Sequence, residues 1–197
     1  MGTDMAAGRR SSKRDHIAPR AQSVFLVGFM GAGKTSVGEA LARQLGWRFI
    51  DLDQRIEARA GRRIADIFRD SGESEFRRAE MDELQRVIAE MDGGGVVVAL
   101  GGGTLVQPEN TGRLAACAAC CVFLDAPVEE LWQRAQAARG ERPLALSENH
   151  FRQLYAARRP RYMEADYCVQ TLGRTVAEVV ADIAARLQAE TAKGESR

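Results

Sequence analysis

The segment from Gly28 to Thr35 holds the residues of this chain best suited to chemistry: a glycine, four further residues, and then Gly-Lys-Thr. The apolar run Val24–Val27 comes before it, and a helical pattern follows it. This arrangement is typical of a phosphate-binding loop, in which glycines let backbone N–H groups converge on a phosphate and the next helix adds its own free N–H groups and dipole. We therefore expect Lys34 to reach the β- and γ-phosphates of a nucleoside triphosphate and the Thr35 hydroxyl to bind Mg²⁺.

Two acids, Asp51 and Asp53, end the next apolar run. Side chains alternate along an extended chain, so both would point to the same side. One acid can help to hold hydrated Mg²⁺, and the other can accept or orient the proton of an acceptor hydroxyl. The strongest strand pattern, Val96–Leu100, ends in glycine where many phosphate-loop proteins have a metal-binding Asp, which leaves Asp51 as the candidate for metal support. The alternative is that both acids only complement a helix dipole.

Three arginines, Arg77, Arg142 and Arg158, stand near the ends of predicted helices or loops. A guanidinium offers a planar fork of donors that suits a carboxylate or a phosphate, although a solvated helix face is the alternative for any one of them alone. Three glycines, Gly101–Gly103, directly follow an apolar run. They would let a ligand meet bare backbone N–H groups, or they form only a flexible turn.

Apolar runs and helical patterns alternate along the chain and would position these residues. Strands are predicted at 24–27, 47–51, 96–100, 120–125 and 167–171, and helices at 36–45, 54–60, 64–69, 75–90, from about 110, from 127, at 150–163 and at 175–187, with a break at 71–74. The alternation predicts an α/β fold with a parallel sheet covered by helices on both faces. Ligands bind outside the carboxyl ends of the strands in such sheets. The loop glycines, the two acids and the three glycines all fall at such ends, so we expect one shared site.

One domain is the simplest organisation for 197 residues. We expect it to span residues 22–189, after a disordered basic extension at 1–21 and before a polar tail at 190–197, with a mobile loop at about 137–148. A net charge of +1 indicates neither a nucleic-acid nor a membrane partner, and no apolar run is long enough to span a membrane.

Cys117 and Cys120 form a C-x-x-C pair, which could indicate a zinc or redox site. The pair runs into an apolar strand and no second ligand pair follows it, so small buried residues are the preferred interpretation. Free thiols fit a reducing compartment, and we expect the chain to be cytoplasmic.

Taken in order, these segments resemble the shikimate kinase family over about residues 23–187. The matching pieces are GFMGAGKT at 28–35, FIDLD at 49–53, IADIF at 64–68, GESEFR at 72–77, LGGG at 100–103, RPL at 142–144 and RRPRY at 158–162. The phosphate loop alone is shared by many NTPases, whereas the ordered set is specific to this family.

The resemblance implies a P-loop kinase of the nucleoside-monophosphate-kinase type, with a five-stranded parallel sheet, helices on both faces and a mobile lid. It implies ATP-dependent phosphorylation of the 3-hydroxyl of shikimate, in aromatic amino-acid biosynthesis, with Mg²⁺ as the metal. The expected partners are the small molecules shikimate and ATP, and the chain is expected to be a monomer.

The resemblance also carries site residues over to this sequence. Shikimate is assigned to Asp53, Phe68, Phe76, Arg77, Gly101, Gly102, Gly103 and Arg158; ATP to Gly31, Ala32, Gly33, Lys34, Thr35, Ser36, Arg134, Arg142 and Arg174; and Mg²⁺ to Thr35 and Asp51. The catalytic residues would be Lys34, Asp53 as the base, and Arg142, which would close from the lid on the phosphates like an arginine finger.

Two arginines, Arg77 and Arg158, would grip the carboxylate of shikimate. Arg158 is preferred to Arg159 because it lies two residues before Pro160, as the family motif requires. On the adenine side the chain departs from the family, since Val176 stands where members often have proline.

Two other functions compete with this one. Another small-molecule kinase of the same architecture, such as a gluconate kinase, would share the loop but not the whole set of acids, glycines and Arg158. A nucleotide-dependent binding or regulatory module without turnover would keep Lys34 and Thr35 but would have no use for an acid at position 53.

Overall fold

The computed structural model describes residues 23–91, 94–117, 119–137 and 147–195. Within these ranges, five strands form one parallel sheet in the order β2-β3-β1-β4-β5. The strands are β1 Ser23–Val27, β2 Arg48–Asp51, β3 Val96–Ala99, β4 Cys120–Asp125 and β5 Tyr167–Gln170. The helices are α1 Lys34–Leu45, α2 Leu52–Ala60, α3 Ile64–Ala89, α4 Pro108–Ala116, α5 Val128–Ala137, α6 Glu148–Tyr162 and α7 Val176–Glu195, and a 3-10 helix, η1 Thr104–Val106, follows β3. The predicted fold class is confirmed.

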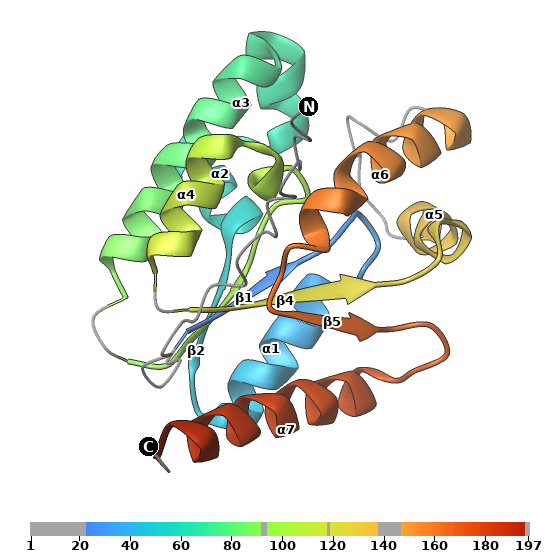
Figure 1. Ribbon diagram of the computed structural model, residues 1–197. Helices are drawn as coiled ribbons and strands as arrows, with labels where there is room; N and C mark the ends of the chain where they lie inside the picture. The colour runs from blue at the N-terminus through green and yellow to red at the C-terminus, as the bar shows by residue number, and fades with distance from the viewer. Residues whose placement is uncertain (1–22, 92–93, 118, 138–146, 196–197) are drawn as a thin grey trace, which may run out of the picture.

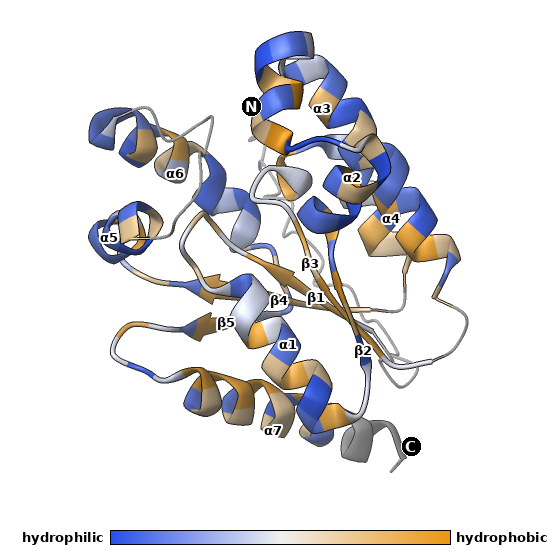
Figure 2. Cartoon of the chain, turned by 180° about the vertical axis from the view of Figure 1, so that it is seen from behind, coloured by the Kyte–Doolittle hydropathy of each residue, from blue (hydrophilic) through white to orange (hydrophobic). Residues whose placement is uncertain are grey.

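Helices cover both faces of the sheet. Figure 1 shows α1 and α7 together on one face and α2, α3 and α4 on the other, with α5 and α6 beyond the end to which the arrow of β4 points. The strands β1 and β3 are buried along their whole length, as the uninterrupted apolar runs predict. Figure 2 shows the same pattern, with hydrophobic residues on the strands and on the inner sides of α1 and α7. The buried sheet thus fixes the positions at which the loops at its carboxyl ends begin.

Most helices begin or end within two residues of their predicted bounds, and two, α3 and α7, differ by more. The break expected at 71–74 is a kink inside α3, where Gly72 has φ 79° and ψ 175°, a conformation that only glycine adopts readily. The last helix, α7, does not end at Leu187 but continues to Glu195, through part of the segment expected to be a polar tail. The residues beyond Leu187 are mostly good helix formers, and polarity alone does not end a helix.

Several predictions concern segments outside the described residues. The expected basic extension lies within residues 1–22, and most of the expected lid, including Arg142, lies within 138–146. Both remain predictions. Of the helices that are described, none combines the length and the apolar character that crossing a membrane requires.

The four cysteines, Cys117, Cys120, Cys121 and Cys168, are all free thiols. Cys120 is buried, and the Sγ atom of Cys117 donates to the carbonyl oxygen of Arg113 at 3.2 Å. Over the described ranges, no three His, Cys, Asp or Glu side chains come together as a metal site. The geometry therefore agrees with a packing role for this C-x-x-C pair.

Candidate active site

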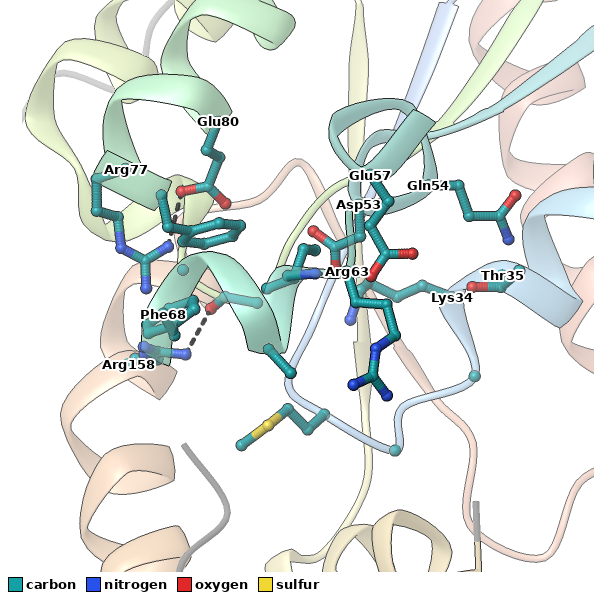
Figure 3. A pocket seen from close by; sticks show the side chains of 18 of the residues that line it. Lys34, Thr35, Asp53, Gln54, Glu57, Arg63, Phe68, Arg77, Glu80 and Arg158 are labelled. Carbon is teal, nitrogen blue, oxygen red and sulfur yellow. Dashed lines mark hydrogen bonds and ion pairs between the residues drawn. The ribbon is translucent and has the colours of Figure 1, made fainter. Parts of the chain in front are cut away.

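A cavity of about 690 Å³ lies at the carboxyl ends of the central strands. Figure 3 shows side chains from α1, α2, α3 and α6 directed toward it. The predicted residues that line it are Gly31, Gly33, Lys34, Thr35, Ser36, Asp53, Phe68, Phe76, Arg77, Gly102, Gly103, Arg134 and Arg158. Segments more than a hundred residues apart in the chain thus meet around one space.

The phosphate-binding loop joins β1 to α1 along one wall of the cavity. Gly31 and Gly33 have φ values of 83° and 85°, and a Cβ atom on Gly31 would lie 2.5 Å from the carbonyl oxygen of Leu131. Glycine is therefore required at position 31 by both conformation and space. The Nζ atom of Lys34 donates to the carbonyl oxygens of Gly28 at 2.9 Å and Phe29 at 3.2 Å. The loop thus holds the ammonium group at the start of α1, where the helix dipole also favours an anion.

Thr35 and Asp51 form a pair of oxygen ligands beside the loop. The Thr35 hydroxyl donates to Oδ2 of Asp51 at 2.7 Å, while Oδ1 of Asp51 accepts from the backbone N–H of Gln54 at 3.2 Å and caps α2. Asp51 therefore caps the N-terminus of α2, as the helix-end alternative predicts, and also contacts the Thr35 hydroxyl, the other residue expected to bind Mg²⁺. Hydroxyl and carboxylate oxygens suit a hard cation such as Mg²⁺, which usually keeps several waters and needs few protein ligands.

Asp53 lies in the first turn of α2 and lines the cavity. Its Oδ1 atom is buried and has no hydrogen-bond partner among the described residues. Burial raises the pKa of Asp53 from 3.8 to about 6, against the lowering effect of Lys34, and the nearby charges of Asp51, Glu80 and Glu57 raise it further. A carboxylate with such a pKa can take up a proton near neutral pH, which is what a general base must do.

Two arginines face the cavity from different helices. Arg77 on α3 donates from Nη1 to Oε2 of Glu80 at 2.7 Å and from Nη2 to Oε1 of Glu73 at 3.0 Å. Arg158 on α6 is only 7% exposed and donates from Nη1 to the carbonyl oxygen of Gly102 at 3.3 Å. Burial, and then the positive charge of Arg77, lower the pKa of Arg158. Figure 3 shows both guanidinium groups on one side of the cavity, with Lys34 on the other.

The wall near these arginines is aromatic. The rings of Phe68 and Phe76 lie 4.8 Å apart, and the Arg77 guanidinium lies 4.9 Å from the ring centre of Phe76. The side of the cavity opposite Lys34 thus combines aromatic rings with the two guanidinium groups.

The three glycines after β3 allow side chains to approach the backbone closely. A Cβ atom on Gly101 would lie 2.5 Å from Oε1 of Glu80 and 2.9 Å from Oδ1 of Asp53, and one on Gly103 would lie 2.4 Å from Nη1 of Arg77. Gly101 itself does not line the cavity. A side chain at position 101 or 103 would thus displace these acids or the arginine, whereas a Cβ atom on Gly102 would meet its nearest neighbours only at 3.7–3.8 Å, in ordinary van der Waals contact.

Replacing Gly103 with Ala is expected to displace the Arg77 guanidinium, because the two ion pairs of Arg77 hold it where the new methyl group would lie. We expect the KM for an acidic substrate to rise about tenfold, the loss of one charge-assisted hydrogen bond, with little change in melting temperature. Steady-state kinetics measure the effect. Gly112→Ala is the matched control, since nothing lies within 4 Å of a Cβ atom there. Equal KM values for the two variants would contradict the prediction.

Three residues predicted to bind ATP are not among those that line the cavity: Ala32, Arg174 and Arg142, the last of which lies outside the described residues. Ala32 is 2% exposed and belongs to the core. Arg174 is held away from the cavity by Asp182, at 3.0 Å, and by the carbonyl oxygen of Glu178. Their assigned contacts with ATP, like those of Arg142, stay predictions.

Four charged or polar residues of the cavity were not foreseen: Gln54, Glu57, Arg63 and Glu80. Glu80 is 0% exposed and accepts from Arg77 and from the Thr104 hydroxyl, at 2.6 Å. Its spacing of three residues from Arg77 on one helix is a signal that could have found it. Glu57 caps α3 through the backbone N–H of Ile64, a tertiary contact with no local signal.

A phosphate-binding loop at the carboxyl edge of a five-stranded parallel sheet with helices on both faces makes this chain a P-loop kinase. A model of the shikimate kinase family matches residues 30–188. The chain belongs to the shikimate kinase family and is an ATP-dependent kinase.

Individual relatives agree with the family assignment. A shikimate kinase from Thermus thermophilus is 42% identical over 170 residues, which are 85% of this chain and 90% of the relative. One from Persephonella marina is 37% identical over 169 residues, which are 85% of this chain and 99% of the relative. The solved structure of shikimate kinase from Acinetobacter baumannii in complex with shikimate has a TM-score of 0.78 at 34% identity, and covers 86% of this chain and 94% of that one.

The competing gluconate kinase shares only the architecture. A gluconokinase from Sinorhizobium meliloti 1021 has a TM-score of 0.58 at 21% identity, over 89% of this chain and 97% of that one. At that identity the likeness concerns the fold alone.

Proposed function

We propose that this chain transfers the γ-phosphoryl group of ATP to the 3-hydroxyl of shikimate in the cavity beside the phosphate-binding loop. One observation carries the proposal: the half-buried Arg77, the buried Arg158 and Gly102 line the same cavity as Lys34 and Asp53, with the two arginines on the side opposite Lys34. Such an arrangement suits a small hydroxylated carboxylate whose acid group binds the arginines and whose hydroxyl reaches a base next to the phosphates. The bound shikimate in the structure of the Acinetobacter relative supports the same substrate.

The phosphate-binding loop would hold ATP, the phosphoryl donor. Backbone N–H groups at the start of α1 and the ammonium group of Lys34 would bind the phosphates, and Lys34 would exchange its carbonyl partners for phosphate oxygens. Thr35, with Asp51 behind it, would hold Mg²⁺. When bound, the metal would neutralise charge on the phosphates.

Asp53 would act as the base. As the 3-hydroxyl oxygen attacks phosphorus, its proton would pass to the carboxylate of Asp53, whose Oδ1 atom has no other partner within the described part of the chain. Lys34 would keep the carboxylate ionised, because its positive charge lowers the pKa that burial raises. Arg77 and Arg158 would orient the acceptor by its carboxylate.

This role predicts a pH dependence set by Asp53. Its pKa is raised to about 6, and only the ionised form accepts a proton, so kcat/KM for shikimate should rise with pH up to about 6 and level above it. Below that point we expect a fall of about tenfold for each pH unit. Initial rates from pH 5 to 8 with saturating ATP and metal measure the profile. A flat profile down to pH 5 would remove Asp53 from the role of base.

A coupled ADP-release assay with shikimate, with gluconate and without an acceptor tests the function as a whole. We expect release that depends on shikimate alone. Release with gluconate only would favour the other small-molecule kinase, and release with neither would favour a binding module. We also propose that the chain works in the cytoplasm, a reducing compartment that its four free thiols fit. We propose that it is a monomer, which sedimentation can check.

A further inference from the structure

Arg158 and Arg159 are neighbours on α6, but their side chains go to different places. Successive helical residues are about 100° apart, so only one of the two can face the cavity. Arg158 lines the cavity, whereas Nη2 of Arg159 donates to Oδ2 of Asp125 at 2.7 Å. Asp125 is the last residue of β4 and its side chain is 4% exposed, while that of Arg159 is 42% exposed.

Asp125 anchors more than one element. Its Oδ1 atom accepts from the Tyr155 hydroxyl of α6 at 3.1 Å, and its Oδ2 atom accepts from Nε2 of Gln170 on β5 at 3.0 Å. Arg159 also donates from Nε to the Tyr155 hydroxyl at 3.1 Å. The carboxylate of Asp125 therefore accepts hydrogen bonds from three side chains, two on α6 and one on β5, and so joins α6 to the carboxyl ends of β4 and β5.

The last turn of α6 needs such an anchor. Pro160 lies inside the helix, where it lacks the N–H that would bond to the preceding turn. The turn that carries Arg158 is thus weakened by its own sequence. On the cavity side it is held by the Tyr162 hydroxyl and by Nη1 of Arg158, which both donate to the carbonyl oxygen of Gly102. On the opposite side it is held by the ion pair of Arg159 with Asp125.

We propose that Asp125 and Arg159 are positioning residues whose ion pair holds the last turn of α6 on the end of β4 and so sets where Arg158 meets the substrate carboxylate. The inference rests on the proposed function, in which Arg158 binds shikimate. Neither residue lines the cavity, so both act through Arg158. The backbone oxygen of Asp125 accepts from Thr171, which in turn holds Arg134 at the nucleotide side, and this link does not need the carboxylate.

The test compares Arg159→Met, Asp125→Asn and the double variant with Arg161→Met. Arg161 is the matched control, because it lies on the same turn, is 51% exposed and, within the described part of the chain, forms its ion pair with Glu164, three residues further along. We expect each single change at the pair to raise the KM for shikimate about tenfold, with kcat and the KM for ATP within about twofold of the unmodified protein. The double variant should be no worse than either single one, since the two residues work as a unit. Arg161→Met should leave all three constants unchanged.

A merely stabilising ion pair would give a different result. It would lower the melting temperature of the variants while leaving the KM for shikimate within about twofold, and this outcome overturns the inference. So would an equal rise in KM for Arg161→Met. Arg159→Lys, which keeps the charge but not the fork, should recover part of the lost affinity. An unmodified chain without shikimate-dependent ADP release would instead overturn the proposed function and the inference with it, so the two failures are distinguishable.

Discussion

Asp53→Asn is expected to remove most of the turnover of this chain while leaving its affinity for ATP nearly intact. The amide has the shape of the carboxyl group but cannot accept the hydroxyl proton, and general-base catalysis of this kind contributes about 10²–10⁴-fold. ATP binding should persist, because Lys34 and the loop that hold the phosphates keep their contacts. The measurements are kcat from initial rates and the ATP dissociation constant from calorimetry.

The same variant is expected to be more stable than the unmodified protein at neutral pH. The pKa of Asp53 is raised from 3.8 to about 6 in the folded chain, so ionisation there favours the unfolded state. The stability contribution of Asp53 is therefore largest below pH 3.8, is lost as pH rises to about 6 and stays lost above, at a cost on the order of 2–3 kcal/mol. Asn carries no such charge.

The two readouts together discriminate between roles. Slow turnover with a higher melting temperature at pH 8 identifies Asp53 as a base whose buried charge destabilises the fold. Slow turnover with a lower melting temperature would indicate lost structure. Asp82→Asn, an exposed acid on α3, is the control and should change neither quantity. Near-normal turnover in Asp53→Asn would refute the proton-accepting role.

Arg158→Ala is expected to raise the KM for shikimate by about 10²-fold, with a much smaller effect on kcat. The reason is that a buried guanidinium which binds a carboxylate is worth more than an exposed one, with losses on the order of 2–5 kcal/mol when one partner is removed. Arg158 is 7% exposed, and its guanidinium lies 5.9 Å from the ring centre of Phe29, so little of its side chain is in contact with solvent.

Two further variants define what Arg158 supplies. Arg158→Lys keeps the positive charge but loses the planar fork, and we expect it to recover only part of the affinity. Arg161→Ala, an exposed arginine paired with Glu164, should leave the KM unchanged. An unchanged KM in Arg158→Ala would take this residue out of the carboxylate site and leave Arg77 as the only arginine proposed there.

The local sequence was sufficient for the elements and for the phosphate-binding loop. Continuous apolar runs predicted the buried strands β1 and β3, because a strand covered on both faces has no polar side. The glycines, Lys34 and Thr35 are adjacent in the chain, so their pattern defines the loop directly. The kink at Gly72 and the end of α7 were harder to predict, since helix ends depend on packing as well as on propensity.

The distant residues of the site could be named only through the resemblance to a family. Nothing near Arg77, Arg158 or Asp53 in the sequence tells that they meet, because their meeting results from the strand order and the crossover helices. The spacing of Glu80 from Arg77 is a signal in the sequence, but in a chain with 27 acids that spacing alone does not show that the fold buries Glu80 fully against Arg77 and Thr104.

By itself, then, the sequence determined that this chain binds a nucleotide phosphate and folds as a parallel α/β sheet, because both depend on contiguous patterns of residue type. The family motif already favoured Arg158 over Arg159 for the substrate site, but only the tertiary structure decided that Arg159 binds Asp125, since a helix turns adjacent residues to different sides and the end of β4 supplies the partner. It also raised the pKa of Asp53 to about 6, because burial among charges contributed by other segments has no counterpart in the linear chain.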